Sequence, residues 1–303
     1  MSRAAVFGEM LVDRFDSDIA VVGGAPFNVA RHLAAFGHAP LMLSAVGQDA
    51  AAQLIMSELD RYGMRRDGVQ VTPSHPTGVV DVRTDAQGGH QFFIRTGSAW
   101  DVIEEAPVRA AMQGLAGDAW LYSGTLALRH AVSRNTGLAL LRGHQGSKYL
   151  DLNWRAGHVS PDVALQAVGL ADVLKVNEEE LAMLAGWLGP QGALDGIENC
   201  ANFVLRHLRL QTLLVTLGAA GALAFDGAGE CTACNGSGPG VQLVDTVGAG
   251  DAFSAVMLAE LLRGWNVATA LARATEFAGH ICEVRGAVPP DLAAYEEWTA
   301  SWT

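Results

Sequence analysis

The stretch Val244-Asp-Thr-Val-Gly-Ala-Gly-Asp-Ala-Phe-Ser254 is the part of the chain from which the fold can be worked out. Residues 241–244 are strand-like and lead into a glycine-rich turn. A helix is predicted to follow over Ala249–Arg263, because four apolar side chains would share one of its faces: Phe253, Val256, Met257 and Leu261. A strand that runs through a short turn into a helix is the repeating unit of α/β proteins.

The turn itself predicts an anion site. Gly248 and Gly250 let the backbone approach a ligand closely and point successive N–H groups into one pocket. The positive end of the helix dipole favours a negative charge at the same place. Asp251 falls in the first turn of the helix, where a carboxylate either stabilises the helix end or accepts a proton from an alcohol during phosphoryl transfer.

Short apolar runs alternate with helical patterns along most of the chain. Strands are predicted at residues 4–7, 41–46, 119–122, 149–152, 173–176, 213–217 and 222–225, and helices between them at 27–36, 50–62, 131–142 and 197–208. Because the strands are continuously apolar, the pattern indicates an α/β fold with a mostly parallel sheet covered by helices on both faces. No Pro/Ser-rich linker divides the chain, so residues 1–303 are expected to form one domain.

One segment breaks this alternation. Residues 77–83 and 91–95 are strand-like, and the turn-rich residues 84–90 lie between them, which predicts a β-hairpin inserted among the strand–helix units. An isolated hairpin is only marginally stable, so it must pack on something. An active-site lid, a dimer interface and a sheet edge all remain open.

The charge balance limits the partners of this chain. Its 303 residues include 32 Asp and Glu against 20 Lys and Arg, a formal net charge of −12. This argues against a nucleic-acid partner and against an anionic membrane surface, because both need clustered basic side chains. An acidic protein can still bind an anionic substrate through a local device such as a helix N-terminus.

Several site classes are disfavoured. No basic leader with an apolar core opens the chain, and no uncharged apolar run reaches about 18 residues, so a cytoplasmic location is expected. The chain has no Gly-Lys dipeptide, which excludes a Walker-type phosphate loop. Cys231 and Cys234 have C-x-x-C spacing without a second pair or a nearby His, and we interpret them as two thiols in a hairpin.

Asp245-Thr246-x-Gly248-Ala249-Gly250-Asp251 resembles the C-terminal signature of the ribokinase-like (PfkB-type) carbohydrate kinase family, whose members transfer a phosphoryl group from ATP to a sugar hydroxyl. Further segments match in the family's order: Gly8-Glu-Met-Leu-Val-Asp13, Gly23-Gly24-Ala25-Pro26-Phe27-Asn28-Val29-Ala30, Gly47-Gln-Asp49, Asp151-Leu-Asn153-Trp-Arg155, Lys175-Val-Asn177-Glu-Glu-Glu180, Thr216-Leu-Gly218-Ala-Ala-Gly221 and Cys282-Glu-Val-Arg-Gly286-Ala287-Val-Pro289. The Gly-Gly-Ala-Pro form is typical of fructokinases.

The resemblance implies roles for residues in every part of the site. Asp251 is implied as the catalytic base, with the anion hole and charge balance supplied by Gly248, Ala249, Gly250 and Arg155. Substrate contacts are implied for Asp13, Gly23, Gly24, Asn28, Arg95 and Asp251. ATP contacts are implied for Asn177, Thr216, Gly218, Gly221, Gly248 and Gly250. Glu180 would hold Mg²⁺ through water, and Asp245 would help to hold a monovalent cation, often potassium.

Each of these side chains also has a structural alternative. Asp13 could be a solvated loop residue and Asn28 a helix cap. Asn177 and Glu180 could form a capped, acidic helix start. Thr216, Gly218 and Gly221 could form a tight turn between strands, and Arg155 could pair with a surface acid.

The resemblance implies a cytoplasmic, ATP- and Mg²⁺-dependent sugar kinase, with fructose as the favoured substrate. In 2-keto-3-deoxygluconate kinases a lid arginine can meet the substrate carboxylate, so Arg95 keeps that activity open as the rival within the family. A rival of another class is a non-catalytic sugar or nucleotide sensor, against which the intact Asp251 argues. The family also implies a small β lid over about residues 11–20 and 75–98 and a homodimer formed through it.

Overall fold

The computed structural model describes residues 2–15, 20–84, 90–189, 195–236, 243–264 and 266–302. The strands are β1 Ser2–Phe7, β2 Leu11–Phe15, β3 Ala20–Gly23, β4 Leu41–Val46, β5 Val69–Val71, β6 Gly78–Thr84, β7 His90–Ile94, β8 Leu115–Ser123, β9 Lys148–Asp151, β10 Val173–Asn177, β11 Thr212–Thr216, β12 Gly221–Asp226 and β13 Cys231–Asn235. The α-helices are α1 Ala25–Ala35, α2 Ala50–Arg61, α3 Glu105–Met112, α4 Ala131–Gly143, α5 Pro161–Val168, α6 Glu178–Leu188, α7 Ile197–Leu208, α8 Ala249–Arg263, α9 Val267–Ile281 and α10 Ala293–Ser301. Three short 3-10 helices lie at Ala99–Val102, Leu126–Leu128 and Gly218–Ala220.

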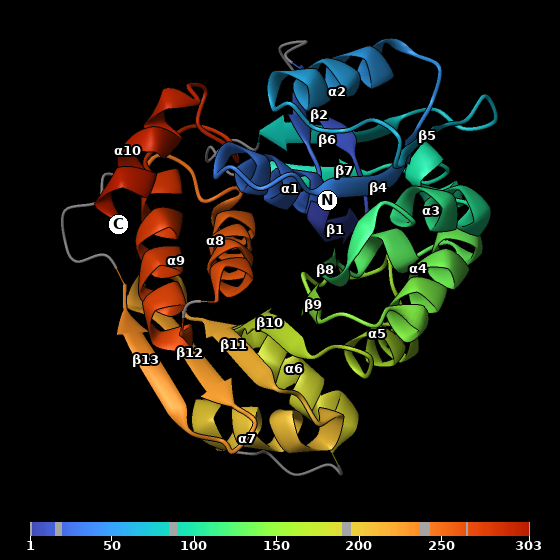
Figure 1. Ribbon diagram of the computed structural model, residues 1–303. Coiled ribbons are helices and arrows are strands. Elements are labelled where there is room, and N and C mark those ends of the chain that lie inside the picture. The colour runs from blue at the N-terminus through green and yellow to red at the C-terminus, as the bar shows by residue number, and fades with distance from the viewer. Residues whose placement is uncertain are drawn as a thin grey trace.

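A nine-stranded sheet forms the centre of the protein (Figure 1). Its strand order is β13-β12-β11-β10-β9-β8-β1-β4-β5, and all neighbours from β5 to β11 are parallel. Among the described strands of this sheet, only β12 runs in the opposite direction, and it pairs antiparallel with β11 and with the edge strand β13. Every residue of β4 is buried, as a strand covered on both faces requires. The predicted α/β fold with a mostly parallel sheet is confirmed.

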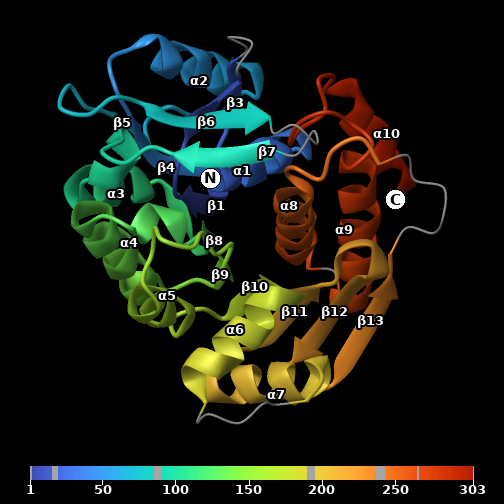
Figure 2. The ribbon, with the colours of Figure 1, turned by 180° about the vertical axis from the view of Figure 1, so that it is seen from behind.

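Two apolar cores cover the two faces of this sheet. One core contains buried side chains of α1, α2, α8, α9 and α10, and the other those of α3 to α7. Helix α8 lies in the middle of its layer, against α1 on one side and α9 on the other (Figures 1 and 2). The prediction of one apolar face for α8 was wrong: residues 251–260 are buried on every side, and Leu261 is less buried than they are. Neighbouring helices enclose α8, so its sequence is apolar all round.

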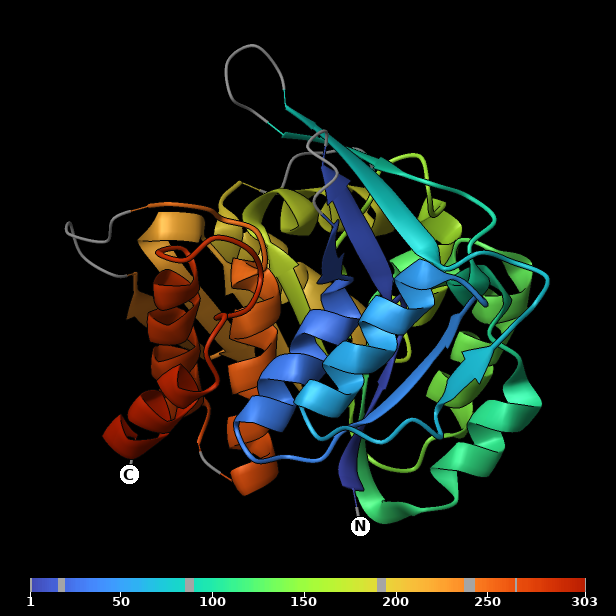
Figure 3. The ribbon, with the colours of Figure 1, turned by 90° about the horizontal axis from the view of Figure 1, so that it is seen from above.

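A second, four-stranded sheet has the order β3-β2-β6-β7. Strands β6 and β7 pair antiparallel, which confirms the predicted hairpin, although residues 85–89 between them lie outside the described part of the chain. Residues 16–19, which belong to the predicted lid segment 11–20, also lie outside it. The sheet packs on α2 through β2 and β3, and β6 and β7 extend outward from the body of the protein (Figure 3). That this sheet acts as a lid remains a prediction.

The predicted strand at residues 241–244 is wrong where it can be checked. Leu243 and Val244 are in no strand and are exposed, while residues 241 and 242 lie outside the described part. Backbone N–H groups of Val244 and Asp245 instead bond to the carbonyl oxygen of Cys282, so this segment runs along the end of α9. Over the described ranges no helix is long and apolar enough to cross a membrane.

The parallel order brings chemically active residues to one edge of the large sheet. Strands β1, β9, β10 and β11 all end there. Glu9, Asn153 and Gly218 lie two residues after the ends of β1, β9 and β11, and Asn177 is the last residue of β10. Ligands of open parallel sheets bind outside the carboxyl ends of the strands. The first turn of α8 reaches the same edge, because Gly250 lies against Lys175 of β10.

Candidate active site

The N-terminus of α8 is shaped by two glycines. Gly248 precedes the helix with φ of 81°, and a Cβ there would lie 2.4 Å from the Cα of Ala287. A Cβ at Gly250 would lie 3.1 Å from the Nζ of Lys175. Gly248, the residue before this helix, has no side chain to cap it, and the N–H of Ala249 donates to the carbonyl oxygen of Thr246 at 3.3 Å. The N–H groups of Gly250 and Asp251 are available to an anion.

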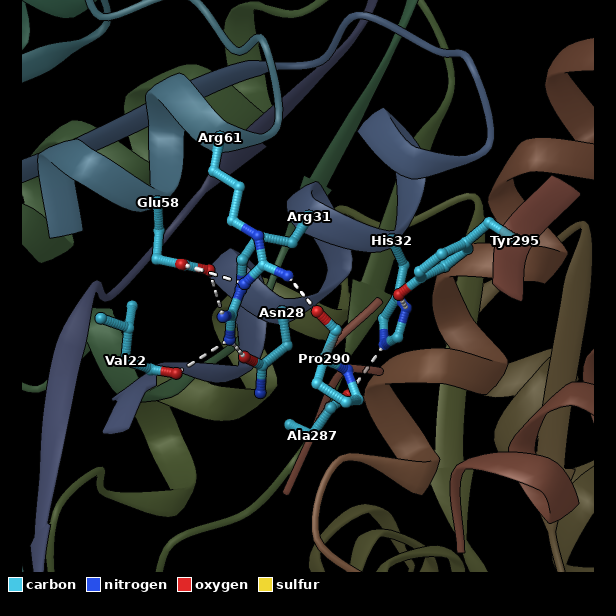
Figure 4. A network of polar contacts seen from close by, with 9 residues as sticks. All are labelled: Val22, Asn28, Arg31, His32, Glu58, Arg61, Ala287, Pro290 and Tyr295. Carbon is cyan, nitrogen blue, oxygen red and sulfur yellow. Dashed lines mark hydrogen bonds and ion pairs between the residues drawn. The ribbon is translucent and has the colours of Figure 1, made fainter. Parts of the chain in front are cut away.

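Ala287, which packs against Gly248, is held in place by a buried histidine of α1. The Nε2 of His32 lies 3.0 Å from the carbonyl oxygen of Ala287, and its Nδ1 lies 2.8 Å from the hydroxyl of Tyr295 (Figure 4). A carbonyl only accepts, so Nε2 carries the proton and Nδ1 accepts from Tyr295. Burial lowers the pKa of His32 to about 3, so the ring stays neutral.

Asp251 and Asn28 meet at the start of α8. The Nδ2 of Asn28 donates a 2.7 Å hydrogen bond to Oδ2 of Asp251, and both side chains are buried. Burial raises the pKa of Asp251 to about 6, against the hydrogen bond from Asn28, which lowers it. A carboxyl group with this pKa is well matched to a general base near neutral pH. Asn28 is not a helix cap, because Gly24 occupies that position and Asn28 lies within the helix.

A buried ionic cluster that the sequence analysis did not assign lies directly beneath this turn. The Nζ of Lys175 lies 3.1 Å from Oδ2 of Asp151, and the hydroxyl of Ser254 donates to the same oxygen at 3.0 Å. Burial opposes the charge of Lys175, yet Asp151 and Glu180 outweigh it, so the pKa of Lys175 is raised. The lysine therefore stays charged next to Gly250, where it adds to the positive potential of the helix end.

Two further carboxyl groups line the region at the end of β1. Burial raises the pKa of Glu9 to about 7 and that of Asp13 to about 6. The Oε2 of Glu9 is buried without a hydrogen-bond partner in the described part of the protein. Asp13 lies against Gly23, where a Cβ would come within 2.5 Å of its Oδ2, and a Cβ at Gly24 would come within 2.6 Å of the carbonyl oxygen of Glu9. These glycines therefore allow the two acids to pack against the start of α1.

Arg155 is the charge that these acids share. It lowers the pKa values of Glu9, Asp13 and Asp251 by charge interaction, so it lies within electrostatic range of all three. Its side chain is exposed and has no ion pair among the described residues. It is the first residue of the turn Arg155–His158 and lies two residues after Asn153, whose backbone φ of 37° is in the left-handed region. A guanidinium that has no ion pair in the described part of the protein is able to receive an anionic group.

Asn177 and Glu180 form a reciprocal helix cap. The side chain of Asn177 accepts from the N–H of Glu180 at 2.8 Å, and the Glu180 carboxylate accepts from the N–H of Asn177 at 2.9 Å. The other carboxylate oxygen of Glu180 accepts from the N–H of Trp154 at 2.6 Å. The capped-helix alternative is thus present, and it leaves each Glu180 oxygen one further acceptor position for water.

Of the residues implied in ATP contacts at the end of β11 and just after it, one is needed for packing and two are free to contact a ligand. A Cβ at Gly221 would lie 2.1 Å from the carbonyl oxygen of Cys234, so this glycine is needed for the packing of β12 on β13. Gly218, with φ of 56°, faces open space. The Thr216 hydroxyl makes a long 3.4 Å contact with the carbonyl oxygen of Val176. Gly218 and Thr216 remain available to a ligand.

Asp245 organises the loop before α8. Its carboxylate accepts from the N–H of Val247 at 3.0 Å and from the N–H of Gly286 at 3.1 Å. It therefore ties the glycine turn to the segment that contains Ala287. Within the described ranges no group of three or more His, Cys, Asp or Glu side chains is arranged to hold a metal ion.

Arg95 is not brought to this group. Its Nε donates to Asp81 at 2.7 Å, and Asp81 also binds Arg14. Asp13 is in register with Val80, the strand neighbour of Asp81, so Asp13 and Asp81 point to opposite faces of the small sheet. Arg95 thus lies on the face opposite to Asp13, neutralised by Asp81.

Proteins similar to this chain identify its family. Residues 9–293, almost the whole chain, match the pfkB family of carbohydrate kinases. The chain belongs to this family. It is 31% identical to the fructokinase of Klebsiella pneumoniae over 276 residues, which cover 84% of this chain and 83% of that protein.

Solved structures of carbohydrate kinases have the same fold. The structure of fructokinase with bound ATP from Xylella fastidiosa superposes with a TM-score of 0.84 at 22% identity and covers 99% of both chains. A double mutant of fructokinase from Vibrio cholerae, in a form with fructose, ADP and potassium ion bound, gives a TM-score of 0.81 at 25% identity, over 99% of this chain and 98% of that one. The chain is therefore a carbohydrate kinase with a ribokinase-like fold.

In this kinase, sequence reasoning missed the buried charges that support the glycine turn. Asp151 and Lys175 stand in matched segments, but only their place at the ends of adjacent apolar strands hints that they meet. Glu9 gave a comparable signal, because an acid two residues after a buried strand is close enough to the core to be buried with it. Arg31 gave none beyond its position three residues after Asn28 in a buried helix.

Proposed function

We propose that this carbohydrate kinase transfers the γ-phosphoryl group of ATP to a hydroxyl of fructose, forming fructose 6-phosphate and ADP. The observation that carries the proposal is the Asp251 carboxylate, held by Asn28 at an uncapped helix N-terminus. A base and an anion site only one turn apart are what phosphoryl transfer to an alcohol requires.

In this proposal Asp251 accepts the proton of the sugar hydroxyl as the hydroxyl oxygen forms a bond to the γ-phosphorus. The bond from that phosphorus to the β–γ bridging oxygen breaks, and the electron pair leaves with ADP. The N–H groups of Gly250 and Asp251 and the charge of Lys175 stabilise the negative oxygens of the transferred group. Arg155 balances charge from the open side.

The side chains at this site suit a Mg²⁺ ion whose ligands come mainly from the nucleotide. Mg²⁺ usually keeps several waters and binds through substrate phosphates and one or two carboxylates. Glu180 already accepts two backbone N–H bonds, so it would hold the ion through water, next to the end of β10. When bound, the ion would neutralise charge on the β and γ phosphates. The Asp245 loop, which joins Gly286 to the turn before α8, is the proposed place for a monovalent cation.

The charge pattern supports a neutral sugar. Glu9, Asp13 and Asp251 all lie within electrostatic range of Arg155, and their ionised forms would repel a sugar acid bound among them. Arg95, the arginine that would favour 2-keto-3-deoxygluconate, is paired with Asp81 on the other face of the small sheet. The intact and pKa-shifted Asp251 also favours catalysis over a silent sensor.

The small sheet is proposed to act as a lid and as the contact between two copies of the chain. Val21, Phe92 and Phe93 are exposed on it, between 41% and 49%. Exposed apolar side chains on strands that extend beyond the body suit a surface that another chain covers. Closing such a lid over the sugar would exclude water and limit hydrolysis of ATP.

The test is ADP release by purified protein with ATP and Mg²⁺. Fructose, ribose, 2-keto-3-deoxygluconate and adenosine are compared as acceptors, and the product is identified by ³¹P NMR. We expect fructose to give the highest kcat/KM. The Asp251→Asn variant should lose turnover while it still binds ATP and fructose in calorimetry. A higher kcat/KM for 2-keto-3-deoxygluconate would contradict the substrate, and near-normal turnover of the variant would contradict the base.

A further inference from the structure

Arg31 of α1 is a buried cation that connects three elements around the base. Its side chain is 3% exposed. One terminal nitrogen, Nη2, donates to Oδ1 of Asn28 at 2.5 Å and to the carbonyl oxygen of Val22 on β3 at 2.9 Å. The other, Nη1, lies 3.3 Å from the Glu58 carboxylate on α2 (Figure 4).

Asn28 stands between this cation and Asp251. A guanidinium can only donate hydrogen bonds, and an ionised carboxylate can only accept them. The amide of Asn28 satisfies both neighbours in one orientation only, with its oxygen toward Arg31 and its nitrogen toward Asp251. The cation at one end therefore fixes which end of the amide faces the carboxylate.

We infer that Arg31 is a positioning residue for phosphoryl transfer: it locks the Asn28 amide in the orientation that donates to Asp251, and so holds the base ready for the sugar hydroxyl. This inference rests on the proposed function, in which Asp251 is the base. Arg31 itself touches neither base nor sugar; it acts through Asn28.

The guanidinium is itself held against rotation. Glu58 balances its charge, and the carbonyl oxygen of Val22 shares Nη2 with Asn28. The ring of Phe27 lies 5.1 Å from the central carbon of the guanidinium. A planar fork fixed by several partners orients an amide better than a flexible ammonium group can. The contact to Val22 also makes the orientation of Asn28 dependent on the small sheet.

Loss of Arg31 should appear in the titration of Asp251. The other charged groups that act on this carboxyl are Asp151, which raises its pKa, and Lys175 and Arg155, which lower it. Glu9 also faces it, since the two carboxyl groups interact. None of these four residues is altered in a variant in which only Arg31 is replaced. A free amide turns part of the time and presents its oxygen to Asp251, which removes the hydrogen bond that lowers the pKa.

The experiment compares Arg31→Met with Arg61→Met. Both arginines pair with Glu58, but Arg61 is partly exposed and does not touch Asn28, so it is the matched control. We expect kcat of Arg31→Met to fall roughly tenfold to a hundredfold, as for a small misplacement of a catalytic group. The midpoint of the acidic limb of its pH profile should move upward. KM for ATP should change little, and Arg61→Met should keep the wild-type profile.

Two more variants separate positioning from simple loss of folding. Arg31→Lys keeps the positive charge on a single donor nitrogen, so its kcat and pH profile should lie between those of Arg31→Met and the wild type. In an Asn28→Ala background, Arg31→Met should cause little further loss, because the arginine acts through that amide. Circular dichroism at each pH reports the folded fraction. Independent, additive losses, or a lower kcat with an unshifted pH profile, would overturn the inference.

A readout without turnover distinguishes this inference from the proposed function. ¹³C NMR of aspartate-labelled protein follows the Asp251 carboxyl directly, assigned by its absence in Asp251→Asn. Its midpoint should lie at about pH 6 in the wild type and higher in Arg31→Met. If no sugar is phosphorylated but the midpoint moves, the proposed function fails and the orienting role of Arg31 stands. An unmoved midpoint overturns the role of Arg31 whatever the substrate.

Discussion

Asn28 and Asp251 are 223 positions apart in the chain, yet the amide of one donates a 2.7 Å hydrogen bond to the carboxylate of the other. The bond joins α1, which follows strand β3 of the small sheet, to α8, which begins at the glycine turn. It therefore places the proposed base between the proposed sugar position and the proposed phosphate position. Neither helix could position the carboxylate alone.

The raised pKa of Asp251 predicts the pH dependence of turnover. A base works in its deprotonated form, so kcat/KM should increase with pH through about pH 6 and then level off. Steady-state assays between pH 5 and 8 measure this rise of kcat/KM, and a second buffer at each pH serves as the control. A limb centred near pH 4, where an ordinary aspartate titrates, would show that Asp251 is not desolvated in the working enzyme.

Glu9→Gln should make the protein more stable at alkaline pH. Burial raises the pKa of Glu9 from 4.5 to about 7, so the folded state holds this proton more tightly than the unfolded state. The stability of the wild type therefore falls as pH rises through this window, by on the order of 3 kcal/mol for this group. Urea unfolding of both proteins at pH 5 and pH 8 checks this. The advantage of the variant should be present at pH 8 and small at pH 5; equal stability at pH 8 would contradict the prediction.

The Lys175–Asp151 pair should show strong coupling in unfolding experiments. Lys175→Met leaves the buried Asp151 carboxylate with Ser254 as its one side-chain donor among the described residues, which should cost roughly 3–5 kcal/mol. Adding Asp151→Asn removes that charge, so the double variant should be more stable than Lys175→Met alone. A double-mutant cycle from denaturant midpoints measures the coupling. Additive effects of the two changes would mean that the pair does not interact in solution.

Two glycines of the β11–β12 connection offer a matched comparison. Both have positive φ, but a Cβ at Gly221 would lie 2.1 Å from a carbonyl oxygen, whereas one at Gly218 meets open space. Gly221→Ala should therefore lower the free energy of unfolding by about 2–3 kcal/mol or more, and Gly218→Ala by only about 1 kcal/mol.

Activity of the same pair tests the proposed nucleotide contact. If Gly218 faces ATP, Gly218→Ala should raise KM for ATP while the protein remains well folded. KM for fructose should be unchanged, which serves as the internal control. An unchanged KM for ATP would remove Gly218 from the nucleotide site.

Much of the fold could be predicted from the sequence, because its signals are local. Short, mostly apolar runs such as Leu41–Val46 favour strands buried on both faces, and this indicates parallel pairing with helices on each side. Alternation around a turn likewise predicted the β6–β7 hairpin. The turn Gly248-Ala-Gly-Asp251 showed where an anion site and an acid would stand together. Local signals failed for α8, where apolar residues on all sides concealed which neighbours it packs against.

Only the tertiary structure decided which charged and polar groups meet. The sequence by itself determined a buried parallel sheet, a glycine turn with Asp251 and an excess of acids. It did not show that Asn28 reaches Asp251, that Arg31 orients Asn28, or that Lys175 lies under Gly250. Nor did it show that Arg95 is neutralised by Asp81 on the far face of the small sheet. Such contacts join residues distant in sequence, and their energies depend on burial and on distances of a few ångströms, which are set when the sheet order and the helix packing are formed.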